Sequence, residues 1–487
     1  MAKKAKKIRT RKGLELKIVN PDAAGIDVSS TEMQVCVPLD RGADYNRKFG
    51  TFTEDLEAIS RWLTDCRITT VAMESTGVYW VPLYMKLLDC GIEVYLVNAK
   101  STKNFVEEKT DEVDAESLML MHAYGLLKPS YQVDNCAREI RNLSRHRDNL
   151  TRSAAKEVQH MQKSMELMNI KLSNVLSDVT GKSGLDIIEA ILSGKRDAQA
   201  LAELADVRCK NPKEVIAKSL VGNWNEDLLF TLKQSYELYQ FIQKQITECE
   251  TKMKALFEKY SSKLSAQMKE IVRSEKQIKK KFKVAFDVED YAYKIFGVNL
   301  MRIPGINEGS LLKLVGELGH NFTEKFDTYR KFCKWENLAP NNKITGGKII
   351  SSKLPKRKNP VGQIFREIAV TLNRAKNPLG DYYRRMQSRK GPMGAIVATA
   401  NKISKIVYTM VKTKTEYDES LIQINEPLYL MKKLKKMQKG IAVIQKQLEA
   451  YALIHGQQYT WETGKIQCCI NGEMARSEFA GVQTLCG

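Results

Sequence analysis

Short apolar runs alternate with amphipathic segments along the first part of the chain, from about residue 22 onwards. The runs AAGIDVSS, EMQVCVPL and NRKFGTF predict three neighbouring strands of an antiparallel ribbon. The next segment, TEDLEAISRWLTDC, predicts a helix with Thr53 as its N-cap. Its apolar face consists of Leu56, Ile59 and Leu63. A strand TTVAMES, a helix VPLYMKLLDC that ends at Gly91, a strand EVYLVNA and a helix beginning near Asp111 complete the series.

The order of these elements, β-β-β-α-β-α-β-α, predicts an α/β domain with an RNase H-like fold over residues 21–136. In that fold the strands AAGIDVSS and TTVAMES are neighbours, and the last helix packs across their ends. We therefore expect polar residues at the ends of these strands and at the start of this helix to lie close together.

From about residue 137 to 294 the chain is mostly helical in pattern, with a coiled-coil-like stretch at about 224–280. Neither glycine nor proline occurs between Gly222 and Gly297. Apolar residues there recur at alternating spacings of three and four, at Tyr239, Ile242, Ile246, Cys249, Met253, Leu256 and Tyr260. Such a seam is typical of a stalk used for packing or oligomerisation rather than of a ligand site.

A second globular unit is predicted over residues 295–415, mostly helical. It opens at LMRIPGINEGSLLKLVGELG, whose P-G-I-N turn is typical of hairpins that set backbone amides against a phosphate, although such turns are also common elsewhere. A glycine-rich loop, a strongly basic run and a helical stretch follow. Residues 416–487 are predicted to be a C-terminal appendage.

The charge balance changes the picture, because 78 Lys and Arg against 57 Asp and Glu leave a net charge of +21. Such an excess indicates a partner with a phosphate backbone. An anionic membrane is the rival partner, but no run of ~18 apolar residues could span a bilayer. Residues 1–20 form a basic arm without an apolar segment behind it, which predicts a phosphate-contacting or solubilising tail rather than a secretory signal. Ten scattered cysteines without a CxxC pair predict free thiols in a reducing cytoplasm and no structural zinc site.

Four carboxylates are candidates for a metal site. Asp111 and Asp114 are three residues apart, so they share one face of a helix. Asp27 lies among apolar residues of the first predicted strand, and Glu74 ends the fourth. Together the four could hold two hard cations, ~3.5–4 Å apart, suited to phosphodiester displacement. The alternative gives Asp27 a turn-capping role and Asp111 an N-cap role.

Several motifs, taken in order, closely resemble the DEDD transposases of bacterial insertion sequences, the insertion-sequence one-ten family, whose relatives include pilin-gene invertases. They are GIDVS, ESTGVYW, VNAKSTKN, EKTDEVDAE, IPGI, LAPNNKITGGK and NRAKNPLGDYYRRM, and they span residues from about 22 to 415. The resemblance implies a RuvC-like catalytic domain, a coiled-coil stalk and a transposase domain with a nucleophilic serine.

The resemblance places the acidic tetrad on Asp27, Glu74, Asp111 and Asp114, with Mg²⁺ or Mn²⁺ as the metal. It further implies a bridge RNA that pairs with donor and target DNA. It also implies dimers paired into a tetramer, in which the serine of one protomer completes the RuvC-like site of another. A prokaryotic, cytoplasmic protein associated with the nucleoid is expected on the same basis.

One position departs from the family pattern, since Thr345 in ITGGK stands where the family usually has serine. Threonine carries the same hydroxyl, but its methyl group stiffens χ1 and crowds an in-line approach. Three alternatives stay open at this point. Thr345 is the nucleophile, Ser351 or Ser352 replaces it, or the enzyme is impaired or uses a metal-activated water.

The residues around Thr345 form a basic run that is expected to contact nucleic-acid phosphates rather than to read bases. The run contains Lys343, Lys348, Lys353, Lys356, Arg357 and Lys358.

These features together predict a metal-dependent transposase that excises and inserts its own element through a covalent protein–DNA intermediate. A site-specific invertase of the same family is one rival. A decayed copy that binds RNA and DNA without cutting, and a Holliday-junction resolvase that needs only the carboxylates, are the others.

Overall fold

The computed structural model describes residues 17–98, 111–264, 271–275, 284–356, 359–420, 426–455, 458–462, 465–470 and 473–475. The chain divides into two compact units, one up to Gln132 and one from Val133. Most of the predicted N-terminal arm, parts of the predicted 224–280 stretch, and Arg357 and Lys358 lie outside the described residues.

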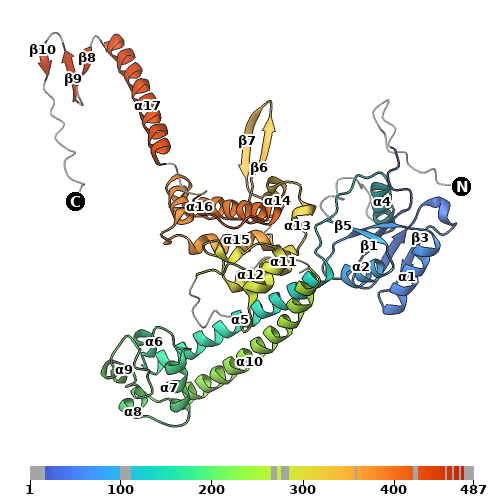
Figure 1. Ribbon diagram of the computed structural model, residues 1–487, viewed down its shortest axis with the longest axis horizontal. Helices are drawn as coiled ribbons and strands as arrows, with labels where there is room; N and C mark the ends of the chain where they lie inside the picture. The colour runs from blue at the N-terminus through green and yellow to red at the C-terminus, as the bar shows by residue number, and fades with distance from the viewer. Residues whose placement is uncertain are drawn as a thin grey trace. The chain divides into compact units, whose positions relative to one another are not determined.

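A mixed five-stranded sheet forms the centre of the first unit (Figure 1). Its strands are β1 (Ala23–Val28), β2 (Met33–Cys36), β3 (Asn46–Phe49), β4 (Thr70–Glu74) and β5 (Glu93–Val97). They lie in the order β3-β2-β1-β4-β5, with β1–β2 and β2–β3 antiparallel and β1–β4 and β4–β5 parallel. The predicted order of strands and helices, including the antiparallel ribbon, is confirmed.

Three helices accompany this sheet, namely α1 (Thr53–Asp65), α2 (Trp80–Asp89) and α4 (Asp111–Ala123). The predicted apolar face of α1 is confirmed, because all three of its residues are buried. The predicted N-cap is wrong: Phe52 is the cap residue, and its backbone N–H donates to the Asp55 carboxylate at 2.9 Å. Thr53 is instead the first residue of the helix, and the Asp55 side chain, three residues after the cap, accepts from the cap amide.

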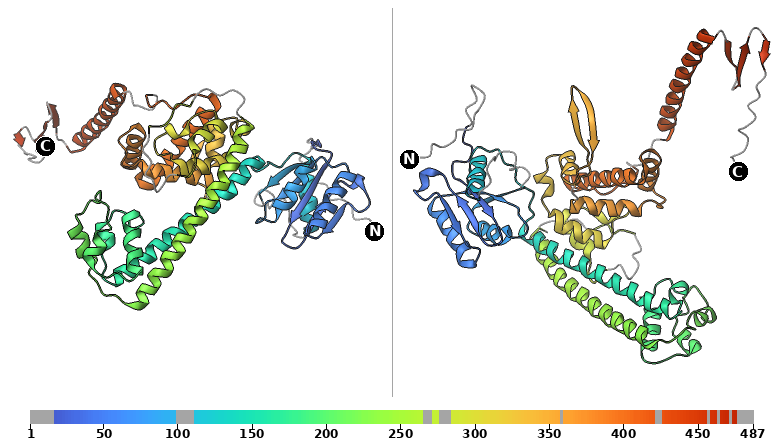
Figure 2. Two further views of the ribbon diagram at one scale, coloured as in Figure 1. Left: turned by 60° about the horizontal axis from the view of Figure 1, so that its bottom comes forward. Right: turned by 180° about the vertical axis from the view of Figure 1, so that it is seen from behind.

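Two long helices, α5 (Asn135–Leu167) and α10 (Glu226–Ser262), run antiparallel and side by side in the second unit (Figures 1 and 2). Near one end Tyr260 donates to Asp134, and near the other Ser164 and Thr231 share a hydrogen bond of 3.1 Å. Between them Arg147 pairs with Glu250 at 2.6 Å. The predicted seam of α10 is largely buried here, so its partner in the described structure is α5 of the same chain.

Four short helices close the far end of this pair around a shared apolar cluster. They are α6 (Leu172–Val175), α7 (Lys182–Leu192), α8 (Ala198–Ala202) and α9 (Lys213–Ser219). Met161 and Met165 of α5 and Leu229 and Leu232 of α10 contribute to the same cluster. The cluster therefore holds the two long helices together at this end.

The remaining helices of the second unit pack around a core rich in phenylalanine. They are α11 (Val288–Phe296), α12 (Glu308–Leu318), α13 (Phe322–Lys325), α14 (Tyr329–Trp335), α15 (Pro360–Thr371) and α16 (Pro378–Thr413). Within α16 the backbone is non-helical at Gly391, where φ is 73°, and Pro392 follows. A kink there is expected, because proline removes a helical hydrogen bond and only glycine takes this φ readily.

A two-stranded hairpin joins α14 to α15, with strands β6 (Asn341–Thr345) and β7 (Lys348–Lys353) (Figures 1 and 2). This hairpin corrects the prediction of a glycine-rich loop, because the residues on both sides of the glycines form paired strands. Gly346 and Gly347 form the turn with φ values of 55° and 75°. Positive φ at both central residues gives the tight turn whose twist matches two paired strands.

A further helix, α17 (Glu426–His455), follows, and then β8 (Gln458–Glu462), β9 (Lys465–Ile470) and β10 (Glu473–Ala475), which pair in the order β10-β9-β8. None of the helices in the described part of the chain is both long and apolar enough to span a membrane.

Candidate active site

Asp27 and Glu74 are brought to one face of the sheet by the pairing of β1 with β4. The parallel register pairs Ile26 with Met73, and the two acids are the next residue on each strand. Both are partly exposed. Since residues at the same level of neighbouring strands point to the same side, the two carboxylates share a face at the carboxyl ends of the strands.

The face that carries the two acids is the one covered by α4. Gly25, two residues before Asp27, lies so close to α4 that an added Cβ would be 2.2 Å from the Ala115 carbonyl oxygen. Ala72, two residues before Glu74, packs with Leu118 of α4. Residues two apart on a strand point to the same side, so Asp27 and Glu74 both face α4.

The direction of α4 decides which of its ends meets the acids. The chain just before β1 reaches the C-terminal end of the helix, because the Val19 and Asn20 amides donate to the Ala123 carbonyl at 2.8 and 3.0 Å. Gly25 then lies at Ala115 and Met119. The strand therefore runs antiparallel to the helix, and Asp27 lies towards its N-terminal end, where Asp111 and Asp114 are found.

The backbone therefore brings Asp27, Glu74 and the start of α4 towards one another, whereas the four-residue site itself stays a prediction. Asp114 is partly exposed, whereas the side chain of Asp111 lies outside the described residues. Asp27 accepts the Val28 amide at 3.0 Å, and Glu74 accepts the Thr76 hydroxyl at 3.2 Å. Within the described ranges, no three His, Cys, Asp or Glu residues form a group able to hold a metal ion.

The donor set nevertheless fits a hard divalent cation. Carboxylate oxygens are the ligands that Mg²⁺ and Mn²⁺ prefer, and neither cysteine nor histidine competes among the four predicted positions. The nearby Cys36 thiol is kept neutral, since burial and, secondarily, the Glu116 carboxylate raise its pKa to about 12. Burial likewise lowers the pKa of His122 to about 4, and its ring hydrogen-bonds Thr70 at 2.9 Å. Both groups are structural members of the core beneath the acids.

Thr345, the candidate nucleophile, lies at the tip of the β6–β7 hairpin in the second unit. It pairs with Lys348 across the glycine turn and is exposed. The alternatives are farther from the tip: Ser351 pairs with Lys343, and Ser352 pairs with Asn342 and donates to its side chain at 2.8 Å. At ~3.4 Å per residue, Ser352 is roughly 10 Å from Thr345 along the strand.

The predicted basic run lies mainly on this hairpin. Lys343, Lys348, Lys353 and Lys356 are all exposed. Ile344, Ile349 and Ile350 beside them are 60–69% exposed. A register shift after Lys343 leaves Ile350 outside the regular pairing. A two-stranded hairpin alone is marginally stable in water, so this one depends on how its base is held.

A buried carboxyl group and several hydrogen bonds connect the base of the hairpin to the helical core. Glu336, just before the hairpin, is fully buried, and burial raises its pKa well above the usual range despite a hydrogen bond from the Ser404 hydroxyl. Arg366 of α15 donates to the Asn337 carbonyl at 2.8 Å, and Asn359 donates to the Trp335 carbonyl at 3.2 Å. The two ends of the hairpin are therefore fixed to each other and to α15.

A surface of paired tyrosines and cations on α14 and α16 was not predicted from the sequence. Tyr382 lies beneath Lys402 at 5.0 Å and Arg385 at 6.0 Å. Tyr329 lies beneath Lys405 at 4.6 Å, with Arg330 at 5.9 Å. Burial, and then the nearby charges of Arg385 and Lys405, lower the pKa of Lys402. The signal in the sequence is the aromatic–basic alternation DYYRRM.

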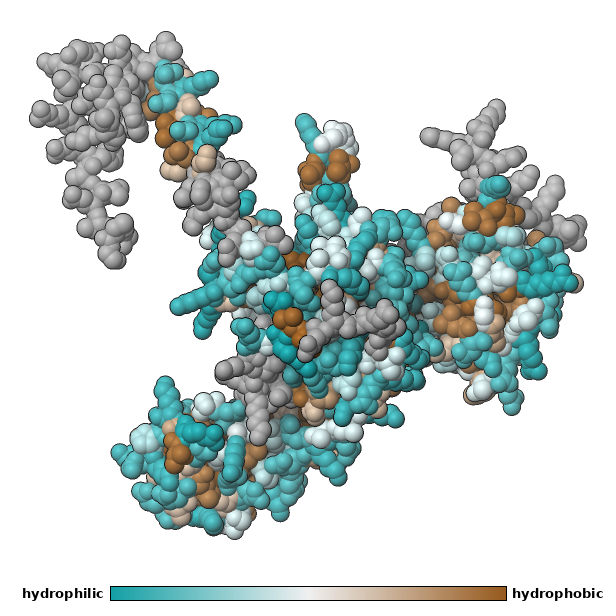
Figure 3. All heavy atoms as spheres, in the orientation of Figure 1, coloured by the Kyte–Doolittle hydropathy of each residue, from teal (hydrophilic) through white to brown (hydrophobic). Residues whose placement is uncertain are grey.

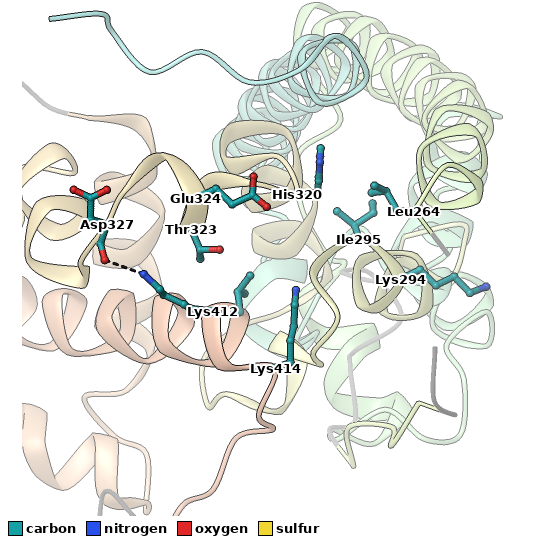
Figure 4. A pocket seen from close by; sticks show the side chains of 10 residues that line it. Leu264, Lys294, Ile295, His320, Thr323, Glu324, Asp327, Lys412 and Lys414 are labelled. Carbon is teal, nitrogen blue, oxygen red and sulfur yellow. Dashed lines mark hydrogen bonds between the residues drawn. The ribbon is translucent and has the colours of Figure 1, made fainter. Parts of the chain in front are cut away.

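A cavity of about 640 Å³ between α11, α13 and α16 is a less suitable active site (Figure 4). Its lysines are largely engaged by backbone carbonyls: Lys412 donates to Asp327 and Lys414 to Phe296, both at 2.8 Å. Glu324 and Asp327 contribute negative charge to the same walls. We therefore assign this cavity no catalytic role.

Comparison with known proteins finds two family models that match separate parts of the chain. Residues 24–170, which include β1, β4 and α4, match a DEDD transposase model of the IS110 type. Residues 298–384, which include the hairpin, match the Transposase IS116/IS110/IS902 family. A search of curated proteins found no match. Since two models of one family match in the expected order, this chain belongs to the IS110 family of DEDD transposases.

Proposed function

We propose that this transposase excises and inserts its element by metal-dependent strand exchange, with Thr345 as the nucleophile. The observation that carries the proposal is the convergence of Asp27, Glu74 and the N-terminal end of α4 on one face of the sheet. The strand order β3-β2-β1-β4-β5 supports an RNase H-like, RuvC-like domain for this site.

The four carboxylates would act as oxygen ligands. Asp27, Glu74, Asp111 and Asp114 would hold Mg²⁺ or Mn²⁺, which when bound activates an attacking oxygen and stabilises the leaving oxygen of a phosphodiester. The family resemblance assigns the carboxylates and the hydroxyl to different protomers of an assembly. A tip position on a hairpin suits a group that must reach a site elsewhere.

The proposed reaction is a transesterification. The Thr345 hydroxyl gives its proton to solvent and its oxygen forms a bond to the scissile phosphorus. The phosphorus–oxygen bond of the DNA strand breaks, and the leaving oxygen takes up a proton from solvent. The products are a DNA end esterified to threonine and a DNA end with a free hydroxyl. A hydroxyl of the exchanging strand then attacks the same phosphorus and releases threonine. The number of phosphoester bonds is unchanged, so no energy source is required.

The hairpin and the tyrosine–cation surface would hold nucleic acid during these steps. The exposed lysines of the hairpin supply phosphate contacts, and the rings of Tyr382 and Tyr329 supply stacking partners for unpaired bases. A guide such as the bridge RNA of the family would supply sequence recognition, which phosphate contacts alone do not provide.

The test is detection of the excised-circle junction by PCR in cells that carry the gene with its native flanking DNA. The set is wild type, Asp111→Asn, Thr345→Ala and Thr345→Ser. A junction in wild type that disappears in Asp111→Asn and Thr345→Ala is expected. A junction that persists in Thr345→Ala would remove threonine from the mechanism and favour Ser351, Ser352 or water.

The same experiment separates the rival functions. An inverted segment instead of a circle would identify an invertase. If only Thr345→Ser produced the junction, the natural chain would be an impaired homologue that binds nucleic acid. A covalent adduct on a denaturing gel, formed with a nicked DNA substrate and absent in Thr345→Ala, would identify the intermediate directly.

A further inference from the structure

The helix α17 carries an apolar seam that the proposed reaction does not use. Its residues follow one another at spacings of three, four, three, four and three: Leu434, Met437, Ile441, Ile444, Leu448 and Tyr451. The helix has 30 residues and would be roughly 45 Å long. A repeat of this kind keeps one stripe of a helix facing a partner helix along its whole length.

Most of the seam is open to solvent, and only Leu448 among its six residues is half-buried. Leu434 and Met437 are each 58% exposed, Ile444 is 56% exposed and Tyr451 is 49% exposed. Figure 3 shows apolar surface along this helix. By contrast, the corresponding residues of α10 are mostly buried against α5. The apolar residues of α17 thus recur with the period of a helix packed against another helix, but most of their side chains are not buried. It also lies beyond the part of the chain that matches the family models, which ends at residue 384.

The polar residues of α17 are arranged as in a helix that pairs with another copy of itself. The positions that flank the seam are uncharged over its central part, namely Gln438, Gly440, Gln445 and Gln447. Lys439 and Lys446, seven residues apart, fall on the side opposite the seam and are exposed. Two such helices can therefore pair without placing like charges against each other.

The same arrangement disfavours nucleic acid as the occupant of the seam. Contact with phosphates requires cations on the contacting face, whereas the central seam is apolar and its flanks are neutral. A second helix with the same apolar repeat can pack against the seam along its whole length and so remove this surface from water. Each copy of the chain brings one such helix.

We propose that α17 pairs with α17 of a second copy of this chain as a coiled coil. This interface is separate from the catalytic face and does not depend on the proposed reaction. It would join copies through the C-terminal segment, whether or not Thr345 is a nucleophile.

The first test is sedimentation of the full-length, nuclease-treated protein over a range of concentrations. Ile444→Ala removes a seam side chain, whereas Val443→Ala removes an equally exposed apolar side chain next to it, off the seam. Alanine favours helix more than either original residue, so unfolding of α17 would not explain a loss of association. We expect Ile444→Ala to raise the dissociation constant of one association step at least about tenfold, and Val443→Ala to leave it unchanged.

A second test locates the contact, because other interfaces could keep copies together in the sedimentation experiment. Benzoylphenylalanine in place of Tyr451 is crosslinked by light in a mixture of ¹⁵N-labelled and unlabelled protein. Crosslinked peptides that join labelled and unlabelled α17, and that are lost in Ile444→Ala, are the expected result. The same probe at Val443 is the control. Crosslinks only to other segments, only to nucleic acid, or none to a second α17 would overturn the proposal.

Discussion

Replacing Gly25 by alanine tests the contact on which the candidate active site depends. A Cβ at this position would lie 2.2 Å from the Ala115 carbonyl oxygen and 2.3 Å from the Met119 nitrogen. Real β carbons do not approach such atoms within 3.0 Å, and both atoms belong to the helix backbone. β1 and α4 must therefore separate by about 0.8 Å or more, because a backbone cannot rotate away as a side chain can.

Two measurable effects follow from this separation. Overpacking of this kind costs about 1–3 kcal/mol, which corresponds to a fall of roughly 5–15 °C in the Tm of a domain of this size. The acids on β1 and α4 move apart by a similar distance, and a displacement of about 1 Å can reduce a reaction by ~10²-fold. We expect Gly25→Ala to be folded but less stable, with circle formation reduced by at least about tenfold.

The assay combines thermal unfolding with quantitative PCR of the circle junction. Gly309→Ala is the matched control, because its new Cβ would meet only the Asn307 side chain, at an ordinary 3.5 Å. It should leave both quantities near wild type. If Gly25→Ala retained wild-type Tm and junction yield, α4 would not need this close approach, and the assembly of the acids described above would be refuted.

Three further predictions concern pH and the hairpin. Because burial raises the folded-state pKa of Glu336, its contribution to stability should be present at acid pH and lost as pH rises. Urea unfolding at pH 5 and pH 8 should show that Glu336→Gln reduces the change in the free energy of unfolding between the two pH values. If that change stayed as large as in wild type, the prediction would be contradicted. Hydrogen bonds from His320 and Tyr260, acting against burial, lower the pKa of Asp134 to about 2. Asp134→Asn should therefore lower the free energy of unfolding above pH 4 and reduce the decrease of that free energy on acidification. Unfolding followed by circular dichroism between pH 2 and pH 6 measures both effects. Lys343→Gln should weaken DNA binding and reduce the slope of the logarithm of the binding constant against the logarithm of salt concentration by about one, measured by fluorescence anisotropy. An unchanged slope would exclude a phosphate contact.

The sequence alone predicted the order of strands and helices in the first unit. Strand and helix periods are local properties, so the order of elements and the buried face of α1 were predicted correctly. The N-cap was predicted incorrectly at Thr53, because the helix begins one residue earlier than expected and the preceding Phe52 is the cap. The hairpin was missed because almost all residues of its two strands are exposed, so the strands lack the alternation of apolar and polar residues that burial imposes.

Burial and pairing were decided by tertiary structure. The spacing of apolar residues in α10 predicted a seam but not the helix that packs on it, because many apolar helix faces could fit such a seam. In the fold, α5 covers this seam. The tyrosine–cation surface joins residues of two helices, so neither segment revealed it alone.

What the sequence determined by itself is therefore the set of chemical groups and the local period of each element: four carboxylates, a threonine beside two glycines, and the regular apolar seam of α10. The tertiary structure decided that Asp27 and Glu74 share a face, since that follows from the register of β1 with β4. It also decided that the N-terminal end of α4 meets them, since only a glycine at position 25 admits the helix so closely. The physical reason is that side-chain direction is set by local geometry, whereas proximity between distant segments is set by packing.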